Sequence, residues 1–317
     1  MIVVVTGASG YIGGQISILL REAGHKVLGI DRRPLPAHLD KQRLFYKFLQ
    51  ADFASKEALN EIVSFKPDAV IHCAGTSLVG PSMYYPSEYW DNNTVKTQQM
   101  LTILQQSLPK TRVIFSSSAA VYGEPVMVPC SEDDPKDPLS PYGQTKLAVE
   151  WMLESYHRAY GLSYVAFRYF NACSADSNAR HGQEPGATHI IARVLESVRD
   201  NTQFTLNGVN YPTEDGTCVR DYVHVEDIAR AHIAALDSMT VPSGTYNLGS
   251  SEGLSNRQII TAVTEITGKQ VNVQIGQERP GDPAVLTADA SKFDKLVPGW
   301  RQHGLKDIIA HAWKWYS

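Results

Sequence analysis

Three glycines near the start of the chain constrain its fold more than any other feature of the sequence. Gly7, Gly10 and Gly13 form a GxxGxxG motif. An apolar run, Ile2–Val5, precedes the motif, and a stretch with helical spacing, Ile12–Ala23, follows it. A strand, a glycine turn and a helix in this order allow the backbone to approach a pyrophosphate at the helix N-terminus, where free N–H groups and the helix dipole favour anions. The motif therefore predicts a dinucleotide-binding unit.

The end of the next apolar run bears on which dinucleotide is bound. That run, Val27–Ile30, leads into Asp31, 18 positions after Gly13. A carboxylate at this place accepts hydrogen bonds from the adenosine ribose hydroxyls and repels a 2′-phosphate, so it favours NAD over NADP. Arg32 and Arg33 follow directly, and an arginine there is either a solvated surface residue or a partner for a 2′-phosphate. Both interpretations of the arginines stay open.

The first half of the chain alternates short apolar runs with longer amphipathic stretches. Further apolar runs lie at Ala69–Ile71, Val113–Phe115 and Tyr164–Tyr169, and stretches with helical spacing lie at Ser55–Phe65, Ser87–Ser107 and Pro141–Tyr160. Continuous Val/Ile runs are typical of strands that are buried on both faces. We therefore expect an α/β fold with a Rossmann-type, doubly wound parallel sheet and crossover helices.

The pattern changes after Asn171, and 317 residues are enough for a second, smaller lobe. A polar stretch is followed by a predicted helix, Ile190–Arg199, and a predicted strand, Phe204–Leu206. Helical spacing around Val223–Leu236 suggests that the chain then returns to the main sheet. We expect a Rossmann domain in residues 1–170 and a discontinuous substrate-binding lobe mainly in residues 171–317, with the part near 223–250 rejoining the first domain.

Charge and composition exclude several classes of partner. A formal net charge of −4 provides no basic face for nucleic acid. No apolar run reaches the roughly 20 residues that a membrane helix needs. The four cysteines are far apart and form no CxxC pair, which argues against a metal site and a disulfide framework and fits a reducing compartment. Because the chain opens on a strand rather than a secretory signal, we expect a cytoplasmic protein.

A serine, a tyrosine and a lysine form a candidate catalytic set. Tyr142 and Lys146 are four residues apart on the helix expected from Pro141, so their side chains share one face. An ammonium beside the phenol, together with a positive nicotinamide ring, should lower the tyrosine pKa from about 10 and make a usable general base. Ser118 follows the strand Val113–Phe115, at the sheet edge where ligands bind. The alternatives are a solvent-facing helical pair and a locally capping serine.

Longer blocks of the sequence resemble one family. TGASGYIG, VIHCAG, SSSAAVYGE, SPYGQTK, RYFNA, YPTEDGTCVRDYVHV, YNLGS and RPGDPAVLTADASK look like blocks of the UDP-galactose 4-epimerases, within the extended short-chain dehydrogenases/reductases. The likeness runs along nearly the whole chain. By resemblance, the catalytic residues are Ser118, Tyr142 and Lys146. Cofactor contacts, beside the three glycines, carry over to Tyr11, Ile12, Asp31, Asp52, Phe53, Cys73, Ala74, Gly75, Asn93, Tyr142, Lys146 and Phe170. Sugar-nucleotide contacts carry over to Ser118, Tyr142, Asn171, His189, Thr205, Leu206, Asn207, Arg220 and Arg279.

Some of these assignments have a plainer alternative. Arg220 and Arg279 suit a diphosphate, because a guanidinium binds phosphate with paired hydrogen bonds, but Asp221 and Asp282 are close enough in sequence to form structural salt bridges. His189 could be an ordinary loop histidine. Asn207 stands where the family often has an aromatic residue.

The resemblance implies reversible inversion at C4 of a UDP-hexose, namely UDP-glucose and UDP-galactose, through an NAD-dependent 4-keto intermediate. Leu286 matches a position that controls space around C2 of the sugar, and its modest size implies turnover of the N-acetyl forms as well. A homodimer is also implied, through the helices expected at Ser87–Ser107 and Pro141–Tyr160. The alternatives are an epimerase of another nucleotide sugar, such as a UDP-uronate, and a nucleotide-sugar 4-keto reductase. A catalytically silent dinucleotide sensor would not need the complete Ser–Tyr–Lys set.

Overall fold

A computed structural model describes residues 1–39, 44–278 and 283–317 of the chain. Its centre is a seven-stranded sheet in the order β10-β6-β5-β4-β1-β2-β3, in which every pair of neighbours is parallel. The strands are β1 (Ile2–Thr6), β2 (Lys26–Asp31), β3 (Lys47–Gln50), β4 (Ala69–His72), β5 (Arg112–Ser118), β6 (Tyr164–Tyr169) and β10 (Gly244–Leu248). The strand order reverses at β1, and this confirms the predicted doubly wound arrangement.

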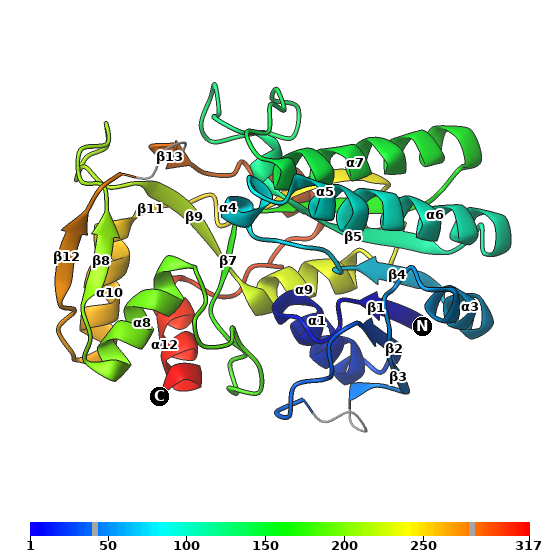
Figure 1. Ribbon diagram of the computed structural model, residues 1–317, viewed down its shortest axis with the longest axis horizontal. Coiled ribbons are helices and arrows are strands. Elements are labelled where there is room, and N and C mark those ends of the chain that lie inside the picture. The colour runs from blue at the N-terminus through cyan, green and yellow to red at the C-terminus, as the bar shows by residue number, and fades with distance from the viewer. Residues whose placement is uncertain (40–43, 279–282) are drawn as a thin grey trace.

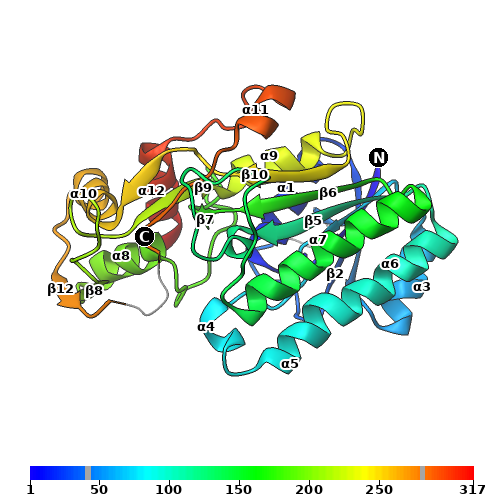
Figure 2. The ribbon, with the colours of Figure 1, turned by 90° about the horizontal axis from the view of Figure 1, so that it is seen from above.

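Helices cover both faces of this sheet (Figures 1 and 2). On one face lie α1 (Tyr11–Glu22) and α9 (Val225–Ala234), and on the other lie α3 (Lys56–Phe65), α6 (Lys96–Ser107) and α7 (Pro141–Tyr160). Successive strand side chains point to opposite faces, so both faces need apolar residues. The continuous Val/Ile runs in the sequence supply them.

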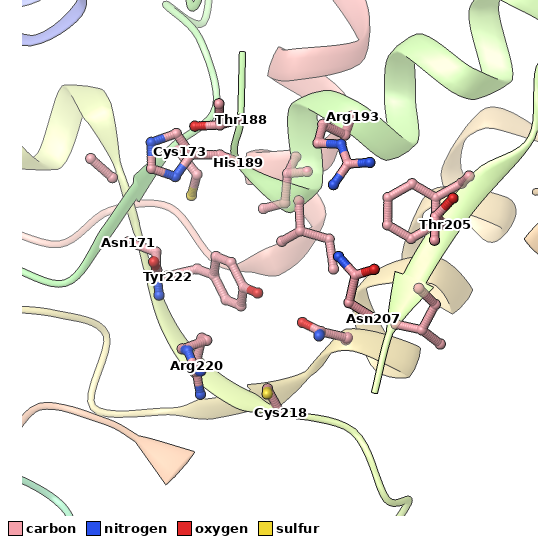
Figure 3. A pocket seen from close by; sticks show the side chains of 16 residues that line it. Asn171, Cys173, Thr188, His189, Arg193, Thr205, Asn207, Cys218, Arg220 and Tyr222 are labelled. Carbon is pink, nitrogen blue, oxygen red and sulfur yellow. The ribbon is translucent and has the colours of Figure 1, made fainter. Parts of the chain in front are cut away.

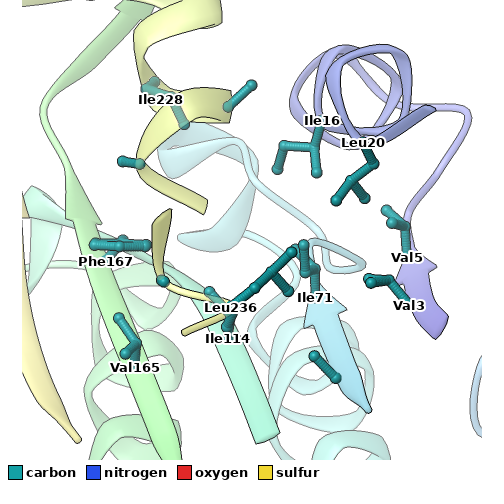
Figure 4. Close-up of a cluster of buried hydrophobic side chains, with 14 of the residues drawn as sticks. Val3, Val5, Ile16, Leu20, Ile71, Ile114, Val165, Phe167, Ile228 and Leu236 are labelled. Carbon is teal, nitrogen blue, oxygen red and sulfur yellow. The ribbon is translucent and has the colours of Figure 1, made fainter. Parts of the chain in front are cut away.

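The core on the α1/α9 face shows how the layers join (Figure 4). Val3 and Val5 of β1 pack in one buried cluster with Ile16 of α1 and Ile228 of α9, whereas Val4 belongs to the cluster on the opposite face. All five side chains are fully excluded from solvent. This alternation fixes the register of β1, because a shift by one residue would exchange the two faces.

A smaller lobe with its own core lies beside the carboxyl ends of the strands (Figure 1). It contains α8 (Ile190–Asp200), α10 (Asn256–Thr267), α12 (Leu305–Tyr316) and a parallel pair, β8 (Phe204–Asn207) with β12 (Val273–Gly276). A small sheet of β7 (Asn171–Cys173), β9 (Val219–His224), β11 (Gly253–Ser255) and β13 (Val285–Leu286) connects this lobe to the main sheet. The remaining short elements are α4 (Val79–Ser82), α5 (Pro86–Tyr89), η1 (Trp90–Val95), η2 (Ala119–Val121) and α11 (Ser291–Leu296).

The structure departs from the sequence predictions at several boundaries. The single helix expected over Ser87–Ser107 is divided by η1, a π-helical turn. The strand expected over Val113–Phe115 continues to Ser118, because its serines pair with β6. Helical structure expected from Val223 begins only at Val225, since the two preceding residues pair with β7. Within the three described segments, no helix has both the length and the apolarity needed to cross a membrane.

Candidate active site

The glycine motif forms a tight cradle at the start of α1. Gly7 has a φ of +72°, and a Cβ atom on it would lie 2.7 Å from the backbone nitrogen of Ala74. A Cβ atom on Gly13 would lie 2.2 Å from the carbonyl oxygen of Gly7. Gly10 is the N-cap of α1 and provides no side-chain cap, so the first N–H groups of the helix stay available. The cradle therefore fits the pyrophosphate of a dinucleotide.

Asp31 lies beside this cradle at the end of β2. Its two carboxylate oxygens accept hydrogen bonds from the backbone N–H groups of Ser9, at 3.0 Å, and Arg33, at 2.9 Å. The Nε atom of Arg33 is 3.6 Å from the same carboxylate, and its guanidinium lies 3.3 Å from where a Cβ of Gly10 would be. Asp31 is thus fixed next to the glycines, and the Arg33 guanidinium forms an ion pair with it.

The other residues of the predicted cofactor set gather at the same edge of the sheet. They follow the carboxyl ends of strands or begin α1: Asp52 and Phe53 after β3, Cys73, Ala74 and Gly75 after β4, Phe170 after β6, and Tyr11 and Ile12 in α1. Burial alone would raise the pKa of Asp52, but hydrogen bonds from Lys96 and Ala54 outweigh it and lower that pKa. The Lys96 ammonium is 2.7 Å from the Asp52 carboxylate.

Asn93, in the π-helical turn, joins the cofactor edge to α7. Its Oδ1 accepts a hydrogen bond from the backbone N–H of Thr76 at 2.7 Å. Its Nδ2 donates to the carbonyl oxygen of Thr76 and to Oγ1 of Thr145, both at 3.0 Å. Because Thr145 directly precedes Lys146, this bridge positions α7 relative to the end of β4.

The candidate catalytic set meets at the centre of this edge. Ser118 is the last residue of β5, and Tyr142 and Lys146 leave one face of α7. Ser140 caps that helix by accepting a hydrogen bond from Gly143, as its sequence position predicts. A hydrogen bond joins the side chains of Tyr142 and Ser118. The Lys146 ammonium donates to the carbonyl oxygen of Ser116 at 2.8 Å and lies 5.8 Å from the centre of the Tyr142 ring.

Burial shifts the pKa values of Tyr142 and Lys146 in opposite directions. Burial raises the pKa of Tyr142, and the hydrogen bond to Ser118 offsets only part of this increase. Burial also lowers the pKa of Lys146 to about 8. The expected lowering came from Lys146 together with a positive nicotinamide ring, and burial of the phenol acts on the pKa of Tyr142 in the opposite direction. The positive nicotinamide ring of a bound NAD would act against this increase.

A pocket lies in the smaller lobe, between β7, α8, β8 and β9 (Figure 3). Six predicted substrate residues line it: Asn171, His189, Thr205, Leu206, Asn207 and Arg220. Leu286 of β13 does not line it but packs against the buried cluster that contains Ala119 and Phe170. Arg279 and Asp282 lie outside the described residues.

The charge of the pocket suits an anion. Arg193 and Arg220 both line it, and none of the described lining residues is Asp or Glu. Burial lowers the pKa of His189, so this imidazole is neutral at neutral pH. Asp221 faces away from Arg220 along β9, and its carboxylate accepts hydrogen bonds from the N–H groups of Ser250, Ser251 and Ala288. Backbone N–H groups, and not a salt bridge with Arg220, therefore hold the Asp221 carboxylate.

Arg193 and Tyr222 are among the lining residues that the sequence analysis did not assign to the substrate. Tyr222 is 3% exposed, and its hydroxyl has no hydrogen-bond partner among the residues that the structure describes. A buried polar group without a partner in a pocket points to a ligand. Tyr222 could have been found from the sequence, because alternate residues of a strand share one face and Arg220 precedes it by two. Arg193 carried no comparable signal.

Residues 3–249 match the model of the NAD dependent epimerase/dehydratase family. The chain belongs to this family. It is 38% identical to UDP-glucose 4-epimerase of Halalkalibacterium halodurans, over 100% of this chain and 96% of the relative.

The chain is also similar to solved structures of proteins named 4-epimerases. UDP-glucose-4-epimerase from Stenotrophomonas maltophila, with bound NAD and formylated UDP-arabinopyranose, has a TM-score of 0.94 and 33% identity, over 100% of this chain and 98% of that one. The UDP-Glc/GlcNAc 4-epimerase of Campylobacter jejuni has a TM-score of 0.83 and 30% identity, over 99% and 98%.

Proposed function

We propose that this chain is an NAD-dependent UDP-sugar 4-epimerase that interconverts UDP-glucose and UDP-galactose. The observation that carries the proposal is that Ser118, Tyr142 and Lys146 come together at the sheet edge that also holds the glycine cradle. Asn171, which follows the neighbouring strand β6, lines the anion-suited pocket. A sugar held at these three residues has its nucleotide in the pocket and its C4 beside the cofactor edge. Whole-chain similarity to proteins named UDP-glucose 4-epimerase supports the choice of substrate.

Each residue has a chemical role in this proposal. When bound, NAD supplies a hydride acceptor for C4 and a positive ring charge beside Tyr142. Tyr142 takes the proton of the 4-hydroxyl and returns it, and Ser118 hydrogen-bonds the same oxygen. Lys146 keeps a positive charge near the phenol. The residues that would hold NAD are Gly7, Gly10, Tyr11, Ile12, Gly13, Asp31, Asp52, Phe53, Cys73, Ala74, Gly75, Asn93, Tyr142, Lys146 and Phe170.

The pocket would hold the nucleotide part of the substrate. Arg220 suits the diphosphate because a guanidinium forms paired hydrogen bonds with phosphate oxygens. The unpartnered hydroxyl of Tyr222 would donate to the same ligand. Asn171, His189, Thr205, Leu206, Asn207 and Arg279 complete the proposed set. Because the binding energy is concentrated on the nucleotide, the 4-keto sugar is free to rotate in the site and present its other face between the two hydride transfers.

The proposal is tested by following C4 of the sugar. Purified protein incubated with UDP-galactose should yield an equilibrium mixture with UDP-glucose, measured by NMR of the anomeric region, without added reductant. Separate incubations with UDP-galacturonate and with UDP-N-acetylgalactosamine compare the other substrates. If none of the three UDP-sugars equilibrates, the proposal is rejected. If only UDP-galacturonate equilibrates, the substrate is a UDP-uronate and not UDP-galactose.

Leu286 is expected to admit an N-acetyl group at C2. It is half-buried in β13 and packs near Ala119 and Phe170, at the catalytic end of the site. Leu286→Tyr adds bulk and a hydroxyl there, so turnover of UDP-N-acetylgalactosamine should fall by about 10-fold or more while turnover of UDP-galactose changes little. Steady-state rates on both substrates measure this. An equal loss on both would mean that the change disturbs packing and that Leu286 does not select the sugar.

Three further assignments belong to the proposal. We assign residues 1–170 to a Rossmann domain and 171–317 mainly to a substrate lobe, with the segment near 223–250 counted with the former. A homodimer through the segment Ser87–Ser107, which contains η1 and α6, and through α7 is supported by the adjacent positions of α6 and α7 (Figure 2). Exposed apolar side chains also support it, with Trp151 of α7 at 60% and Val95 of η1 at 47%. Four free cysteines support a reducing, cytoplasmic location.

A further inference from the structure

One end of the pocket is formed by two elements of the smaller lobe, α8 and β8. Asn171, at the other end, follows β6 and so adjoins the strand that carries Ser118. Figure 3 shows Asn171 and His189 on one side of the pocket and Arg193, Thr205 and Asn207 on the opposite side. If the sugar lies at Tyr142, as proposed above, the base of the nucleotide lies between α8 and β8.

Arg193 provides a fixed donor at this end. Its guanidinium carbon lies 5.5 Å from the centre of the Phe204 ring, and Phe204 is only 4% exposed. The ring supports the guanidinium through a cation–π contact. In Figure 3 the Arg193 side chain is directed into the pocket, on the side where Asn207 lies. A guanidinium carries five N–H donors and no acceptor.

Asn207 presents a donor to the same space. A Cβ atom on Gly276 of β12 would lie 2.7 Å from Oδ1 of Asn207, so the amide oxygen faces β12. Figure 3 shows the amide nitrogen on the other side, toward the pocket. The two side chains therefore direct hydrogen-bond donors toward the base. This arrangement favours a base that presents carbonyl oxygens over one that presents amino groups.

We infer that Arg193 selects the base of the nucleotide by donating a hydrogen bond to the 4-oxygen of uracil. Cytosine has an amino group at the same ring position, and this group would direct its own N–H at a guanidinium that cannot accept it. An unpaired donor in a buried site costs affinity, so such a site rejects the wrong base more strongly than a purely apolar one would. The inference rests on the proposed function for the direction of the nucleotide.

Binding of the free nucleotides tests this without requiring turnover. Isothermal titration calorimetry of the NAD-loaded protein with UDP and with CDP gives both affinities. Arg193→Met keeps an apolar stem against Phe204 but removes the donors. The substitution should weaken the affinity for UDP by about 10- to 100-fold, the range for a hydrogen bond to a charged group. The affinity for CDP should change by less than about threefold. The preference for UDP over CDP should therefore largely disappear.

Two companion variants make the result decisive. Arg199→Met removes another α8 arginine, which pairs with Asp200 at 2.7 Å, and should leave both affinities unchanged. Arg193→Lys keeps a charged donor that cannot accept a hydrogen bond, so part of the preference for UDP should return. Equal weakening of UDP and CDP, restored by lysine, would overturn the inference in favour of a diphosphate contact. No weakening of either would place Arg193 outside the binding site.

Failure of this inference differs from failure of the proposed function. A wild-type protein that equilibrates UDP-galactose but binds UDP and CDP equally keeps its proposed activity and loses only the role of Arg193. A protein that prefers UDP through Arg193 but equilibrates no sugar keeps the base-selecting residue and loses the proposed reaction. Thermal unfolding of each variant, compared with wild type, separates a local loss of binding from a loss of folding.

Discussion

Replacement of Tyr142 by phenylalanine should lower kcat for UDP-galactose by about 100-fold or more, the scale of general acid–base catalysis. The substitution removes one oxygen atom, and this oxygen is the group that hydrogen-bonds Ser118 in the buried site. Affinity for UDP should be unchanged, because the nucleotide pocket is formed by other elements. Initial rates and calorimetric titration with UDP measure the two quantities separately.

Tyr89 supplies a matched control for this change. It is 2% exposed, its ring is edge-on to that of Tyr142 at 6.4 Å, and its hydroxyl donates to the carbonyl oxygen of Leu78. Tyr89→Phe removes a neighbouring buried hydroxyl that has no catalytic role in the proposal, so kcat should stay within about threefold of wild type. If Tyr142→Phe lost no more activity than this control, Tyr142 would not be the base.

Replacement of Glu150 by glutamine should lower the free energy of unfolding by about 3–5 kcal/mol, because it leaves a buried charge without its partner. Glu150 lies one turn after Lys146 on α7, and its carboxylate is 2.7 Å from the guanidinium of Arg168 on β6. Their side chains are 5% and 4% exposed. Ser117 of β5 donates to the same carboxylate, so this pair fixes α7 against the strand that carries Ser118.

The same helix carries a control for the ion pair. Glu154 lies one turn further along and pairs with Arg158, but these side chains are 46% and 72% exposed. Glu154→Gln should change the free energy of unfolding by less than about 1 kcal/mol, as is usual for surface pairs. Urea unfolding monitored by circular dichroism gives both values. A double variant, Glu150→Leu with Arg168→Met, should recover much of the lost stability because no unpaired charge remains. Equal costs for Glu150→Gln and Glu154→Gln would show that burial of the first pair adds nothing.

The amino-acid sequence by itself determined the parts of this protein that depend on neighbouring residues. The strand, glycine turn and helix around Gly7–Gly13 follow from spacing and from backbone crowding that only glycine permits. Helix α7 has the ends that its sequence predicts, since Ser140 caps its start and Gly161, with a φ of +72°, ends it. The four-residue spacing of Tyr142 and Lys146 then places both side chains on one face.

Only the tertiary structure decided which distant residues meet and how deeply they are buried. The pKa of Tyr142 is raised because surrounding elements exclude water from it, and no pattern along α7 carries that information. Arg193 and Tyr222 line one pocket although 29 positions separate them, and Glu150 meets Arg168 and Ser117 from three different elements. Periodicity and capping are local properties of a chain, whereas desolvation and pairing depend on segments that only folding brings together.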